Sequence, residues 1–161
     1  MAAGANTMRA GLLIGAAAGA AGTTALNAVT YLDMVSRGRP TSSTPEDTVE
    51  KLSEKTHLPI PGDDQTRANR IAGLGPLTGL VAGVVVGAGL GLARSAGWRP
   101  GPIVSGLVGT VGALIGSNGP MTALGVADPR TWAVKDWVSD VIPHMAYGAV
   151  TALVLRGLDN R

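Results

Sequence analysis

The sequence predicts an all-α integral membrane protein whose four transmembrane helices pack through stripes of glycine and other small residues. Tiny residues dominate the chain, with 24 glycines and 24 alanines among 161 residues. Three stretches, 10–32, 71–93 and 100–127, contain no charged side chain. Each exceeds the length of about 20 mostly apolar residues that suffices to span a bilayer. Phe is absent and aromatic residues make up 3 % of the chain. A soluble core is hard to build from this inventory, because large apolar side chains supply most burial energy.

Charge and cysteine content exclude several classes of function. The formal net charge is +2, which is too balanced for a nucleic-acid reader, and the basic residues form no stripe. Without cysteine there is no disulfide, zinc–thiolate site or cysteine nucleophile. No GxSxG or HExxH motif occurs, and no glycine lies between a predicted strand and a helix. We therefore expect no enzymatic activity, metal, cofactor, small-molecule substrate or nucleic-acid partner.

The first predicted span covers 10–34. Asp33 lies at its end, and Arg37 follows four residues later, where it could pair with that carboxylate. A cleaved signal peptide is one alternative, since Arg9 precedes an Ala-rich apolar stretch. This stretch is longer than a usual signal-peptide core, and cleavage would leave an odd three spans. A soluble glycine-rich protein is the other alternative, and the long uncharged runs oppose it.

A polar connector follows at 36–69, and the segment from Arg37 to Arg70 holds 12 of the 24 charges. Thr44 is typical of an N-cap and Pro45 of a first helical position, so we predict a short surface helix at about 45–56. We expect a solvated connector that rests on the membrane. A partner-docking element is the alternative.

The remaining spans are predicted at 71–94, 102–126 and 138–157. The last contains an uncharged run of only 15 residues, 141–155, so the predicted span includes flanking residues on both sides of this run. Tryptophans beside a span usually lie at the level of the lipid headgroups. All three tryptophans of the chain lie at predicted span ends and are therefore predicted interface anchors: Trp98, Trp132 and Trp137.

An internal repeat is suggested by shifting the chain along itself. A shift of 91 residues places Gly15 on Gly106 and Asn27 on Asn118. A shift of 69 residues matches part of the second span, 78–83, to part of the fourth, 147–152. These offsets favour a duplicated helical hairpin, although the bias toward small residues also produces such matches by chance.

Glycines recur every four residues in three of the spans, which places them on one face of each helix. Such a stripe lets helices approach closely in lipid, where close packing drives association. We expect the stripes to pack inside the bundle; homo-oligomerisation and a glycine-lined pore are the alternatives. The predicted packing residues are Gly11, Gly15 and Gly19 in the first span, Gly75, Gly79, Gly83, Gly87 and Gly91 in the second, and Gly112 and Gly116 in the third.

Polar groups at membrane depth are costly and are therefore functional candidates. Asp136, Asp140 and His144 are spaced by four and share a helix face if Pro143 lies within the first turn. They could form a proton or solute pathway, begin the last span as interfacial residues, or bind a metal, for which the pattern is weak support. Asn27 and Asn118 favour hydrogen bonds between helices. The candidate polar site comprises Asn27, Asp33, Asn118, Asp140, His144 and Tyr147.

The glycine-stepped first span, the Arg-Gly-Arg-Pro exit at 37–40 and the Pro-His-Met-Ala-Tyr-Gly run at 143–148 together resemble the YagU-like family. These are small, largely uncharacterised bacterial inner-membrane proteins linked in general terms to acid tolerance. The resemblance covers the overall plan of the chain. It implies an inner-membrane location and favours a proton-related role for Asp140 and His144, and it carries over no catalytic residue.

The leading functional hypothesis is a structural or interaction role, either self-assembly or an accessory subunit of a membrane complex. Its partners would be the lipid bilayer and a second copy or another membrane protein. The alternative is a proton, ion or small-solute pathway that uses Asp140 and His144. An intramembrane enzyme ranks third.

Overall fold

The computed structural model describes residues 2–159, with side chains described for 4 and 6–157. These residues form helices and connecting turns, and the described part contains no strand. Four helices are long and apolar enough to cross a membrane, which confirms the predicted all-α class with four candidate spans. The elements are α1 (Ala2–Arg37), α2 (Thr44–Thr56), α3 (Asp64–Ser95), α4 (Pro102–Ala123), the 3₁₀ turn η1 (Pro129–Thr131) and α5 (Val134–Asp159).

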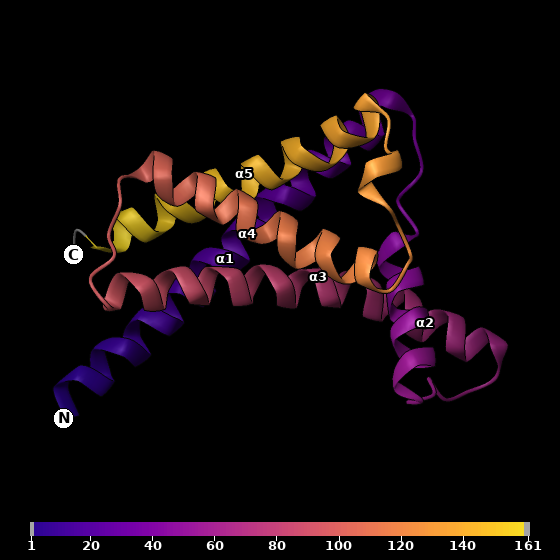
Figure 1. The fold of residues 1–161 in the computed structure, drawn as a ribbon, viewed down its shortest axis with the longest axis horizontal. Helices are drawn as coiled ribbons and strands as arrows, with labels where there is room; N and C mark the ends of the chain where they lie inside the picture. The colour runs from indigo at the N-terminus through magenta and orange to yellow at the C-terminus, as the bar shows by residue number, and fades with distance from the viewer. Residues whose placement is uncertain (1, 160–161) are drawn as a thin grey trace.

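The four long helices run back and forth, so that both ends of the chain lie at the same end of the bundle (Figure 1). The turn between α3 and α4 also lies at this end, whereas α2 and η1 lie at the opposite end. Helix α1 crosses α3 and then runs alongside α5, and α4 packs against α5. The arrangement is that of a multi-pass membrane protein.

The helix ends differ from the predicted spans in both directions. Helix α3 begins at Asp64, before the predicted 71, because the Asp63 carboxylate accepts a hydrogen bond of 2.8 Å from the Thr66 N–H and caps the helix. Helix α4 ends at Ala123, before the predicted 126. Gly125 takes φ +73°, and the hydrogen bonds of its N–H and of the Val126 N–H close the helix end.

Helix α2 confirms the surface helix predicted at 45–56, with a different N-terminus. Thr44 is the first helical residue and Ser43 occupies the N-cap, so the prediction of Thr44 as the cap was wrong. The Ser43 backbone is in the right-handed helical region rather than the extended region that capping favours. Its hydroxyl therefore bonds the Asp47 carboxylate at 3.0 Å instead of a main-chain N–H.

The same helix packs against the ends of α3 and α4. Val49 is buried, and the Glu50 carboxylate pairs with Arg67 of α3 at 2.7 Å. The Lys55 ammonium donates to the main-chain oxygen of Ala123, the last residue of α4, at 3.4 Å. A cation at this position complements the negative end of the helix dipole. The connector is therefore a packed cap on one end of the bundle.

Glycines form the seam between α1 and α3. A Cβ atom at Gly87 would lie 2.5 Å from the Cα of Gly19, and one at Gly91 would lie 2.7 Å from the Cα of Gly15. Gly11 faces Ser95 and Gly83 faces Thr23 in the same seam. At Gly15, Gly19, Gly87 and Gly91 the nearest atoms belong to the opposite backbone, so any side chain larger than hydrogen would push the helices apart. The glycines of this seam pack against one another within the chain.

The other predicted packing glycines differ in their surroundings. Gly112 and Gly116 face Val86 of α3, where a Cβ atom would lie 3.1 Å and 3.8 Å from its methyl groups. Gly75 lies beneath Glu46 of α2, whereas a Cβ atom at Gly79 would meet no other atom within 4 Å. Gly79 thus belongs to the sequence ladder without contributing to packing.

Two glycines outside the predicted set make equally tight contacts. A Cβ atom at Gly148 of α5 would lie 2.8 Å from the Thr110 nitrogen of α4, and one at Gly22 of α1 would lie 2.8 Å from the Tyr147 ring. The internal repeat, with its offsets of 91 and 69 residues, stays a prediction.

Candidate functional site: a polar cluster between α4 and α5

The candidate site is built from one turn of α5 and one end of α4. Helix α5 begins at Val134, so Pro143 lies in its interior and not in its first turn. The helix nevertheless continues through Pro143, and Asp140 and His144 remain one turn apart on one face. Asp136 lies apart from them: it is exposed, and its carboxylate accepts from the Ala133 N–H at 3.1 Å at the start of the helix.

Hydrogen bonds connect four side chains in this cluster. The Nδ1 atom of His144 lies 2.7 Å from the main-chain oxygen of Asp140 and 3.4 Å from its carboxylate Oδ1. The Nε2 atom lies 3.1 Å from the hydroxyl of Ser117 on α4. The adjacent Asn118 donates from Nδ2 to the other carboxylate oxygen of Asp140 at 2.8 Å. His144 is 7 % exposed, so its ring is buried between α4 and α5, and each helix supplies one of its hydrogen-bond partners.

This arrangement satisfies the imidazole in both of its charge states. In the neutral state, Nδ1–H donates to the Asp140 main-chain oxygen and Nε2 accepts from the Ser117 hydroxyl. In the cationic state, both ring nitrogens donate, and the Ser117 hydroxyl can turn to the Leu114 main-chain oxygen, 3.3 Å away. The Asp140 carboxylate then lies beside the positive ring. A proton can be gained or lost with one hydroxyl rotation and no helix movement.

Asn118 completes the cluster and leaves one atom without a partner. Its Oδ1 is buried and accepts no hydrogen bond from the described residues. A buried polar atom left unpaired typically costs about 1–3 kcal/mol. Such an atom next to a carboxylate and a histidine distinguishes this cluster from an ordinary satisfied helix contact.

The inward face of α5 remains polar beyond His144. Tyr147 is fully buried, and its hydroxyl donates to the Gly83 main-chain oxygen of α3 at 2.6 Å. Thr151 is also fully buried, and its hydroxyl donates to the Ala18 main-chain oxygen of α1 at 3.4 Å. Asp140, His144, Tyr147 and Thr151 therefore form one polar stripe, and its hydrogen bonds reach all three other long helices.

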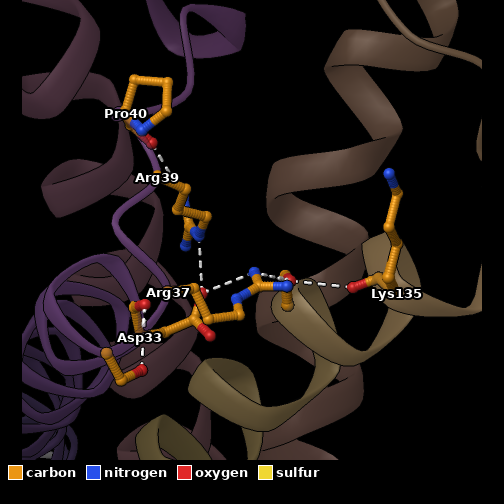
Figure 2. A network of polar contacts seen from close by, with 7 residues as sticks. Asp33, Arg37, Arg39, Pro40 and Lys135 are labelled. Atoms are coloured by element: carbon orange, nitrogen blue, oxygen red, sulfur yellow. Dashed lines mark hydrogen bonds and ion pairs between the residues drawn. The ribbon is translucent and has the colours of Figure 1, made fainter.

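A second polar network holds the cluster's outer end (Figure 2). The Asp33 carboxylate accepts from Arg37 at 2.7 Å, which confirms the predicted pair, and from Arg39 at 2.6 Å. Arg37 of α1 also donates to the Ser139 hydroxyl of α5 at 2.5 Å. Ser139 precedes Asp140, so this network fixes the position of the part of α5 that carries the cluster. Exposed ion pairs contribute little to stability, so we assign this network a positioning role.

Asn27 does not join the cluster. It is exposed on α1, and no hydrogen bond of its side chain is found among the described residues. The interhelical hydrogen bond predicted for the two asparagines is thus found only for Asn118.

The tryptophans lie at helix ends, as predicted. Trp98 follows α3 at one end of the bundle. Trp132 and Trp137 lie at the other end, with ring centroids 5.2 Å apart in an edge-to-face pair. Their role as membrane-interface anchors stays a prediction.

Ser117 is a site residue that the sequence did not single out. Its neighbour Asn118 was singled out, so the correct turn of α4 was predicted. Only the rotation of α4 against α5 decides whether Ser117 or Asn118 faces His144. Among the described residues, no three His, Asp or Glu side chains gather closely enough to hold a metal ion.

Comparison with protein-family models, curated proteins and solved structures finds no match for this chain. The resemblance to the YagU-like family therefore rests on sequence features alone. The geometry of the cluster is what points to a function.

Proposed function

We propose that this protein is a multi-pass membrane protein that carries a proton through the Asp140–His144 cluster between α4 and α5. The observation that carries the proposal is the buried imidazole of His144, which has hydrogen-bond partners on both ring nitrogens and a carboxylate beside it. Ionisable residues at membrane depth most often mark ion pathways or proton relays. A location in the bacterial inner membrane belongs to the same proposal and rests on the family resemblance.

In the proposed mechanism, the two ring nitrogens serve as entry and exit. In the neutral ring Nδ1 carries the proton and Nε2 is the open site, so a proton enters at Nε2 from the Ser117 side, and the cationic ring then releases its other proton from Nδ1 to the Asp140 carboxylate, 3.4 Å away. Asp140 and Ser117 therefore act on opposite ring nitrogens. The Asp140 carboxylate stabilises the cationic ring, and the Ser117 hydroxyl accepts from Nε2–H in that state. Asn118 holds the carboxylate in place through its 2.8 Å hydrogen bond.

A proton suits this interior better than a larger solute. Tyr147 and Thr151, the next polar residues of the stripe, are fully buried. The adjacent helices meet backbone to backbone at the glycine seams. A proton moves along hydrogen bonds without displacing packed atoms, whereas a hydrated ion would have to separate the helices.

The test is proton flux into proteoliposomes that contain a pH-sensitive dye and carry an imposed membrane potential. We expect flux with the wild type and its loss in His144→Ala and Asp140→Asn. The chain offers matched controls, because His57 and Asp136 are exposed and outside the cluster. His57→Ala and Asp136→Asn should retain flux. Equal flux in His144→Ala and His57→Ala, or wild-type flux no greater than in empty liposomes, would contradict the proposal.

A second candidate function, association with another membrane helix, is favoured by Asn27. Its amide is exposed six residues before Asp33, inside an otherwise apolar helix, where lipid offers no hydrogen bond. An asparagine both donates and accepts, so a second copy of the chain could pair with it. The glycines of the α1–α3 seam are covered within the chain, so this surface, not the glycine stripe, would be the contact. Native mass spectrometry should show a dimer that Asn27→Leu removes; a monomeric wild type would exclude it.

A further inference from the structure

A cavity lies at the end of the bundle opposite α2, where α3 ends and α4 begins. Its volume is about 290 Å³, near the lower limit of about 300–1,000 Å³ typical of ligand pockets. Arg94 of α3 and Arg156 of α5 line it from two different helices, together with Ser105 and Pro100. This cavity is remote from the Asp140–His144 cluster and takes no part in the proposed proton relay.

The polar lining of the cavity is ordered. Ser105 is 2 % exposed, and its hydroxyl donates to the Pro100 main-chain oxygen at 3.2 Å. The oxygen of this hydroxyl accepts a hydrogen bond from the Arg94 guanidinium at 3.4 Å. Arg156 is exposed at the rim. Guanidinium groups bind phosphate oxygens through paired, charge-assisted hydrogen bonds, and two of them from different helices can hold one phosphate group from two sides.

The charge around the cavity favours an anion. The sequence from 71 to 127 contains no acidic residue, and the first acidic residue of α1 is Asp33, at the far end. From 141 onward the sequence contains one, Asp159, whose side chain lies outside the described part. Helix α4 also begins here, at Pro102, so the positive end of its dipole adds to the two arginines.

We propose that this cavity binds a phosphate group, which in the membrane is supplied by the headgroup of an anionic lipid. Arg94 and Arg156 lie in the last turns of two apolar helices, and the exposed Trp98 lies in the adjoining turn. Charged and tryptophan side chains at span ends lie at the headgroup level. Basic pockets between transmembrane helices bind the headgroups of anionic lipids.

The test measures lipid binding to the purified full-length protein. After reconstitution in nanodiscs that mix phosphatidylcholine and phosphatidylglycerol, native mass spectrometry of the released protein reports which lipid stays bound. We expect phosphatidylglycerol to be retained in preference to phosphatidylcholine. Arg156→Gln should reduce this preference several-fold. Arg99→Gln, a nearby exposed arginine outside the cavity lining, should preserve it. Arg156 is exposed, so its substitution should leave the fold intact, which circular dichroism checks.

A parallel arm distinguishes the source of the phosphate. In neutral detergent without lipid, inorganic phosphate should raise the melting temperature of the wild type and not of Arg156→Gln if a free phosphate can occupy the cavity. Retained phosphatidylglycerol without this effect assigns the site to the lipid headgroup. If phosphatidylglycerol is retained equally by wild type, Arg156→Gln and Arg99→Gln, or is not preferred at all, and phosphate has no differential effect, the proposal is overturned.

Discussion

The backbones of Gly19 and Gly87 are in direct contact across the α1–α3 seam. A Cβ atom on Gly87 would lie only 2.5 Å from the Cα of Gly19. Two positions further along α3, a Cβ atom on Gly89 would have no other atom within 4 Å. One helix therefore contains a glycine that packing requires and a nearby glycine that it does not.

These two glycines give a matched pair of variants. Gly87→Ala should destabilise the bundle by about 1–3 kcal/mol, because the added methyl group overpacks a backbone contact. Gly89→Ala should be neutral or slightly stabilising, since alanine favours the helix. Unfolding by a denaturing detergent, followed by circular dichroism, measures both. Equal stability of the two variants would show that the seam is not formed.

Tyr147 and Tyr31 form another matched pair, as the chain has only two tyrosines. Tyr147→Phe removes the 2.6 Å hydrogen bond to the Gly83 main-chain oxygen. Interhelical hydrogen bonds in membranes average about 0.6 kcal/mol, so we expect a loss of that order. Tyr31 is 59 % exposed, and Tyr31→Phe should leave the unfolding free energy unchanged. A larger effect at Tyr31 than at Tyr147 would contradict the packing.

The absence of cysteine makes the chain suitable for mapping its topology by labelling. Single-cysteine variants Ser42→Cys and Thr131→Cys place a thiol before α2 and in η1, and Ala96→Cys places one in the α3–α4 turn. In sealed vesicles of one orientation, a membrane-impermeant thiol reagent should label the first two together and Ala96→Cys only from the other side. Labelling of all three from one side would exclude four spans.

Asp63 gives a prediction for pH dependence. Hydrogen bonds from the Thr66 side chain and main chain hold the pKa of Asp63 below its usual value. A carboxyl whose pKa is depressed in the folded state contributes stability above its unfolded pKa and loses it as the pH falls through the folded pKa. Amide hydrogen exchange at the start of α3 should therefore be faster in Asp63→Ala than in the wild type at neutral pH. This difference should vanish in acid; a constant difference at all pH values would assign the effect to something other than the ionised cap.

The first three long helices could be predicted from the sequence because uncharged runs of 20 or more residues are typical of transmembrane helices. The fourth was predicted from an uncharged run of 15 residues together with its flanks. The helix ends were less predictable. Asp63 and Gly125 set two of them through local capping, which does not depend on where apolar residues begin or end. The short helix α2 was predicted to within one residue, but its packing on Arg67 and Ala123 was not.

Most contacts between helices could not be predicted from the sequence. A period of four predicts a stripe on α3, but α1 crosses α3 (Figure 1). The contact between the two helices therefore runs from Gly83 to Ser95, and Gly79 is left open. Similarly, the four-residue spacing predicts that Asp140 and His144 are neighbours, because both lie on α5. The bond from Ser117 depends on the rotation of α4, which no local pattern encodes.

Nitrogen-15 NMR of the imidazole in nanodiscs can show whether the buried His144 ring is held at both nitrogens. The chain has two histidines, so His57→Gln leaves a single ring to observe. The signals should report a ring whose proton is on Nδ1, because that atom lies 2.7 Å from the Asp140 main-chain oxygen. Ser117→Ala should then change the Nε2 signal, since Nε2 lies 3.1 Å from the Ser117 hydroxyl. A neutral ring protonated on Nε2, or an Nε2 signal that Ser117→Ala leaves unchanged, would contradict this arrangement.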